Sequence, residues 1–73
     1  AYEIASLNGN ISRMEGEVYL HLHAVIADAE NQTRGGHLVD ARVSATAELV
    51  VQAFSGTAGR KYSQEIGLNL FEF

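Results

Sequence analysis

The chain contains no cysteine and no proline among its 73 residues. Without cysteine, no disulfide can stabilise the fold and no cysteine nucleophile is available. A domain of this size buries only about 60% of the surface that its unfolded chain exposes, so its hydrophobic core is small. We therefore expect further stability to come from a metal, from additional chain, or from association with copies of itself.

Basic residues are also scarce. Five Lys and Arg stand against nine Asp and Glu, which gives a formal net charge of −4. This balance disfavours non-specific nucleic-acid binding, because neutralising phosphates requires clustered Lys and Arg. The one adjacent basic pair, Arg60-Lys61, is interpreted as ordinary surface.

Long apolar runs are absent as well. No run approaches the roughly 20 residues of a membrane span, and no signal peptide opens the chain. No repeat or linker divides it either. These features predict one domain over residues 1–73 in a cytoplasmic protein that does not bind membranes.

All three histidines lie between Gly16 and Leu38. Residues 17–28 are rich in β-branched and aromatic types and predict a strand, in which His21 and His23, two apart, share one face. Both alternating sets of this strand are largely apolar, which is typical of a central strand covered on both sides. We therefore expect these histidines to be at least partly buried.

The third histidine follows a polar loop, at the start of a predicted strand over residues 37–44. In an antiparallel pair, directly opposite residues face the same side. A loop with an odd number of residues centred near Glu30 puts His37 opposite His23, and centring it one residue earlier puts His37 opposite His21. A loop with an even number sends His37 to the other face, so the register tests this prediction.

The other segments predict a mainly antiparallel sheet with little helix, in the α+β class. Residues 2–7 predict a strand that ends in a turn at Asn8-Gly9-Asn10. Residues 45–54 fit either a helix or a strand, and we assign a strand. The remaining expectations are a loop over 55–59, one helical turn within 62–67 and a last strand over 68–73.

The three histidines support two interpretations. Neutral imidazole is a common zinc ligand, and three histidines leave a fourth position open. Alternatively, Tyr19, His21 and His23 form a polar stripe that hydrogen-bonds to carboxylates or backbone without a metal. Spacing alone does not decide between these interpretations.

Carboxylates could complete or orient a metal site, since metal-bound histidines usually have such a partner. The candidates are Asp28, Asp40 and Glu48. Gly35-Gly36 lacks the residues of a phosphate-binding loop, and no serine stands in a nucleophile elbow. No catalytic or cofactor-binding residue is therefore assigned.

Several segments together resemble the PPC domain (plants and prokaryotes conserved), prokaryotic stand-alone type. They are Tyr2-Glu3-Ile4 with Ser6-Leu7-x-Gly9-x-Ile11-Ser12, His21-Leu22-His23, Gly35-Gly36-His37-Leu38, Thr46-Ala47-Glu48, and Tyr62 with Gly67-Leu68. The resemblance implies a mainly antiparallel sheet with some helix, a homotrimer, and a metal bound by His21, His23 and His37.

The chain also departs from the family pattern. It corresponds to the C-terminal portion of the family fold, and Ala1 stands where many relatives have Arg. No basic AT-hook is present, so the DNA binding of plant members does not carry over. The chain is then either a fragment or a naturally short form, and we expect it to complete its sheet by association.

Three functions follow as expectations. The first is a zinc-binding PPC-like module acting in assembly or interaction. The second is a zinc-dependent hydrolase or hydratase, because an open zinc site activates water. The third is family-associated DNA binding or transcriptional regulation. A cupin is a weaker match, because Asp28 replaces the motif's Glu, the first spacer is one residue short, and the second motif needs a proline.

Overall fold

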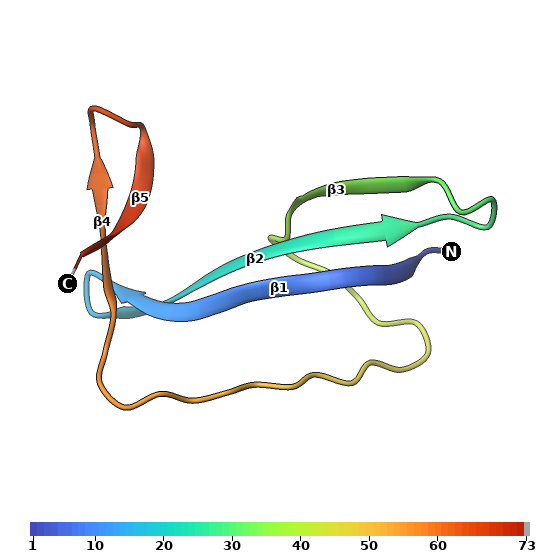
Figure 1. Ribbon diagram of the computed structural model, residues 1–73, viewed down its shortest axis with the longest axis horizontal. Helices are drawn as coiled ribbons and strands as arrows, with labels where there is room; N and C mark the ends of the chain where they lie inside the picture. Colours follow the sequence, from blue (N-terminus) through green and yellow to red (C-terminus); the bar gives the residue numbers. More distant parts are fainter. Residues whose placement is uncertain (73) are drawn as a thin grey trace.

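The computed structural model describes residues 1–72. They form one five-stranded sheet in the order β3-β2-β1-β4-β5 (Figure 1). Neighbouring strands are antiparallel, except that β1 and β4 run parallel over two residue pairs. The mainly antiparallel sheet is confirmed, whereas the expected helix has no counterpart among residues 1–72. The strands are β1 (Glu3–Met14), β2 (Glu17–Ala27), β3 (Thr33–His37), β4 (Gly59–Ser63) and β5 (Leu68–Glu72).

A two-residue turn joins β1 to β2. Glu15 and Gly16 have φ angles of 53° and 79°, the left-handed pair that a type I′ hairpin turn requires. The predicted turn at Asn8-Gly9-Asn10 is wrong, because β1 continues through it and pairs with β2. Gly9 serves a different purpose there: a Cβ on it would overlap the backbone carbonyl oxygen of His21. This glycine permits close strand approach rather than a turn.

A five-residue loop, residues 28–32, joins β2 to β3. The Asp28 carboxylate accepts hydrogen bonds from the backbone N–H groups of Glu30 and Gln32, both at 2.9 Å. Asn31 takes the left-handed conformation, with φ 63°. The loop is therefore organised by local side-chain chemistry that asparagine and aspartate supply readily.

The next predicted strand, residues 37–44, is wrong. β3 begins earlier, at Thr33, and ends at His37, after which Leu38 donates one backbone hydrogen bond to Leu22. Residues 38–58 contain no regular secondary structure, so the strand assigned to residues 45–54 is also wrong. These residues pair with no strand of the described chain, although β3 and β5 each have an unpaired outer edge, so the strand pattern alone does not lead to pairing.

The C-terminal hairpin contains β4, which the sequence did not predict, and β5. The backbone N–H of Gly67 donates to the Ser63 carbonyl at 2.6 Å, closing one turn where a helical turn was predicted. The last strand is confirmed over residues 68–72, and Phe73 lies outside the described residues.

The pairing of the strands gives the sheet two faces of different character. Side chains on one face are mostly polar, and we call it the histidine face; its members include Asn8, Asn10, Ser12, Tyr19, His21, His23, His37, Arg60 and Asn69. The opposite face is apolar, with Ile4, Leu7, Ile11, Val18, Leu20, Leu22 and Ile26. No hydrophobic residue among residues 1–72 is fully buried. The expectation that β2 is central in the sheet is confirmed, but the expectation that both its faces are covered is wrong for this chain.

No helix among the described residues has the length and hydrophobicity needed to cross a membrane.

Candidate metal centre

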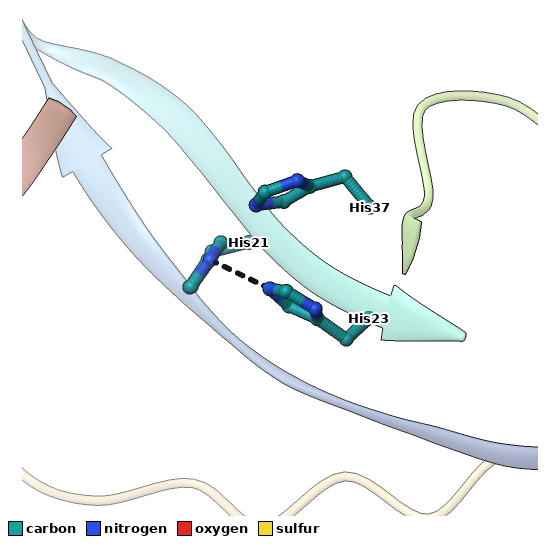
Figure 2. A group of neighbouring side chains, drawn as sticks. All are labelled: His21, His23 and His37. Carbon is teal, nitrogen blue, oxygen red and sulfur yellow. Dashed lines mark hydrogen bonds between the residues drawn. The ribbon is translucent and has the colours of Figure 1, made fainter. Parts of the chain in front are cut away.

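The three histidines come together on one face of the sheet (Figure 2). The five-residue loop between β2 and β3 is centred on Glu30, and His37 lies directly opposite His23. His21 precedes His23 by two residues on β2 and so shares its face. Of the registers that the sequence left open, the structure has the odd-numbered loop that places His37 opposite His23, and the predicted convergence of the three histidines is confirmed.

The imidazole nitrogens are close enough to share one ion. One potential ligand atom from each ring lies within 4.8 Å of the others. The Nε2 atoms of His21 and His23 are 3.3 Å apart. Two nitrogens at about 2.0–2.1 Å from a tetrahedral zinc ion would lie about 3.3–3.4 Å apart. The His21–His23 spacing matches that of two zinc ligands, and the ligand atom of His37 lies within 4.8 Å of both.

The rings also pack against one another. The centroids of His23 and His37 are 4.3 Å apart, and those of His21 and His23 are 5.1 Å apart. His21 is half-buried, whereas His23 and His37 are exposed. Partial burial was expected for the histidines of β2, and it is found only for His21. The reason is that nothing in the described chain covers the histidine face beyond the C-terminal hairpin.

Arg60 on β4 is the residue of this region that the sequence interpretation missed. It is half-buried, and its guanidinium lies 3.3 Å from Nδ1 of His21. The sequence signal was only the pair Arg60-Lys61, which was interpreted as ordinary surface. That interpretation is wrong for Arg60, because a parallel pairing of β4 with the end of β1 brings it onto the histidine face.

Several groups lower the pKa of His21 below its usual 6.5. Partial burial has the largest effect, followed by the positive charges of Arg60, His23 and His37. A lowered pKa favours the neutral imidazole, which is the form that binds a metal.

The expected carboxylate partner is not in this group. The group of potential ligands found among residues 1–72 consists of the three histidines alone. Asp28 holds the loop between β2 and β3, as described above. Asp40 and Glu48 are exposed residues of the irregular segment that follows β3. The donor set is thus three imidazole nitrogens, which suits Zn²⁺ with one position open to solvent or a ligand.

Comparisons with known proteins agree with this architecture. Residues 1–55 match the family model of the Plants and Prokaryotes Conserved (PCC) domain. A crystal structure from Bacteroides thetaiotaomicron VPI-5482, described as a "putative DNA binding protein", is similar with 39% identity and a TM-score of 0.92. The alignment covers 99% of this chain and 52% of that one, so the chain spans about half the length of the solved structure. No curated protein matches the chain.

Proposed function

Because the chain belongs to the Plants and Prokaryotes Conserved (PCC) domain family, we propose that it is a metal-binding module of that family. In this proposal His21, His23 and His37 bind Zn²⁺, and the module acts in assembly or interaction. The observation that carries the proposal is the convergence of three imidazoles from two strands, with their ligand atoms within 4.8 Å.

A bound zinc ion with three histidine ligands would polarise a water molecule in its open position, lowering the pKa of that water to about 7. A zinc-dependent hydrolase or hydratase would also need a residue to move protons. The residues paired beside the histidines on β1 are Asn8 and Asn10, which are poor general bases. We therefore favour a binding module over an enzyme.

Zinc titration by calorimetry tests the site. We expect one Zn²⁺ per chain in the wild-type protein and no measurable binding in His23→Ala. Asn8→Ala is a matched control, because Asn8 lies opposite His23 on the same face and offers no nitrogen ligand of comparable strength. Full zinc content in His23→Ala, measured by elemental analysis, would refute the ligand set.

DNA binding is a second candidate, and the description of the similar Bacteroides protein favours it. The net charge of −4 opposes it, since no excess of Lys and Arg is available to neutralise phosphates. Electrophoretic mobility shift at physiological salt, with a basic protein as positive control, separates the candidates. A complex that persists at this salt and weakens steeply as salt increases would favour DNA binding over the module.

We further propose that copies of the chain associate, as a trimer, in the cytoplasm. The support is that no hydrophobic residue among residues 1–72 is fully buried, so the apolar face gains stability when a partner covers it. Sedimentation measures the mass of the assembly, and a sharp monomer peak near 7.9 kDa across the concentration range would contradict association.

A further inference from the structure

Arg60 is held in one position by contacts to two neighbouring strands. Its Nε donates to the Ser12 hydroxyl at 3.2 Å, and Nη2 donates to the Asn10 side-chain carbonyl at 3.1 Å, both on β1. Its Nη1 donates to the backbone carbonyl of Asn69 on β5 at 2.7 Å. The guanidinium carbon also lies 4.0 Å from the centroid of the Phe71 ring. These contacts fix the direction in which the remaining Nη2 hydrogen points.

That hydrogen determines the tautomer of His21. The Nη2 atom of Arg60 lies 3.3 Å from Nδ1 of His21. A guanidinium has donors and no acceptor, so Nδ1 must accept and cannot carry a proton. Neutral His21 then carries its proton on Nε2, the atom that lies 3.3 Å from Nε2 of His23. The hydrogen bonds therefore run in one direction, from Arg60 to His21 and from His21 to His23.

Zinc binding requires the opposite tautomer. A histidine that binds a metal through Nε2 carries its proton on Nδ1, and this N–H ordinarily donates to a carboxylate, carbonyl or water. Arg60 instead places a hydrogen-bond donor beside Nδ1 of His21. Its positive charge also repels a cation at Nε2. Consequently the Arg60–His21 hydrogen bond has to break before Nε2 of His21 can bind an ion.

We infer that Arg60 is a positioning residue of the histidine group, which holds His21 in the Nε2–H tautomer and thereby weakens zinc binding. The effect on zinc rests on the proposed function, whereas the tautomer does not. Arg60 thus couples the C-terminal hairpin to the metal site, because the residue that attaches β4 to β1 is also the one that opposes the ion.

Side-chain ¹H–¹⁵N NMR of the metal-free protein tests the tautomer. We expect the Nε2–H form of His21 in the wild-type protein, a mixture of tautomers in Arg60→Gln, and the wild-type form in Lys61→Gln. Lys61 is a matched control because it is the exposed neighbour of Arg60 and projects from the opposite face. A wild-type His21 in the Nδ1–H form would overturn the inference without involving zinc.

Zinc titration of the same variants tests the consequence. We expect Arg60→Gln to bind zinc about tenfold more tightly than wild type, and Lys61→Gln to bind it equally tightly. Arg60→Lys retains the charge and a donor, so its affinity should stay close to that of wild type. Circular dichroism identifies the variants that fold, and equal or weaker zinc binding by folded Arg60→Gln would overturn the inference. If neither wild type nor any variant binds zinc, the proposed function fails, and the tautomer measurement still decides the role of Arg60.

Discussion

Two consecutive regions of this chain have similar residue patterns and different structures. Residues 3–37 form the three strands β1, β2 and β3, whereas residues 38–58 form no regular structure (Figure 1). Both contain short alternating runs of β-branched residues that are typical of strands. In the first region each run has a neighbouring strand to pair with. In the second, Val50 is 100% and Phe54 79% exposed, and no strand forms although the outer edges of β3 and β5 are unpaired among the described residues.

This difference shows that an alternating pattern of apolar and polar residues predicts the capacity of a segment to form a strand. The pattern does not show that the strand forms. A tight turn at Glu15-Gly16 and a five-residue loop capped by Asp28 bring three runs into register. No comparable turn follows His37. The boundary between the two regions therefore falls directly after the last ligand of the proposed metal site.

Exchanging His37 and Leu38 tests the difference between the two regions at their boundary. The double variant His37→Leu, Leu38→His keeps the composition and moves the imidazole to the other face of the sheet. We expect zinc affinity to fall by at least about 100-fold, because loss of a ligand exceeds the 10–100-fold effect of losing an outer partner. Calorimetric titration measures this change.

The same kind of exchange in the irregular region is its control. Val39→Asp with Asp40→Val exchanges two neighbours that have no regular pairing, and we expect unchanged zinc affinity. If the two exchanges weaken zinc binding equally, the face of the sheet on which His37 lies is not what matters.

Two glycine substitutions test how closely the strands of the paired region approach one another. Gly9→Ala places a Cβ against the His21 carbonyl oxygen and the Leu22 side chain, so we expect the free energy of unfolding to fall by about 1–3 kcal/mol. Gly36→Ala meets no atom within 4 Å and should change stability by no more than about 0.5 kcal/mol. Urea denaturation measures both. Equal stability of the two variants would show that β1 and β2 are less closely paired at Gly9.

Within the paired region the sequence predicted β2 and the antiparallel return of the chain to His37, because these signals are local, whereas it placed the end of β1 and the bounds of β3 wrongly. A loop centred on Glu30 was one of the registers that the sequence left open, and β2 followed from composition. Gly9 was misinterpreted because Asn-Gly-Asn has turn chemistry in isolation, whereas its actual role depends on a strand that is twelve residues away.

Long-range contacts account for the other omissions. Arg60 reaches His21 only because β4 pairs in parallel with the end of β1, a contact between residues 39 positions apart. The hydrophobic periodicity of the sequence carries no information about such a long-range strand pairing. Residues 45–54 were assigned a strand because their pattern fits one, but such a pattern does not tell whether a neighbouring strand pairs with it.

Polar substitutions in the irregular region test what its exposure means. If copies of the chain cover this segment, Val50→Ser with Phe54→Ser should lower the sedimentation mass toward 7.9 kDa and leave zinc affinity unchanged. The stability of an isolated monomer should change by no more than about 0.5 kcal/mol, because both side chains are already exposed. Unchanged assembly mass would place the self-association surface elsewhere, on the apolar face of the sheet.

The smallest expected effect is on the pH dependence of the free energy of unfolding, and it arises from His21 in the paired region. His21 has a pKa below its usual 6.5 in the folded chain, whereas the unfolded chain has the usual value. Above that value His21 is neutral in both states and contributes nothing. As the pH falls through 6.5, the unfolded chain takes up the proton first, so the free energy of unfolding decreases until the folded-state pKa is passed. Urea denaturation of metal-free protein at pH about 7.5 and about 5.5 should show this decrease, with a smaller one in His21→Gln. An identical decrease in the variant would mean that the charges facing His21 from Arg60 and its neighbouring histidines do not destabilise its protonated form.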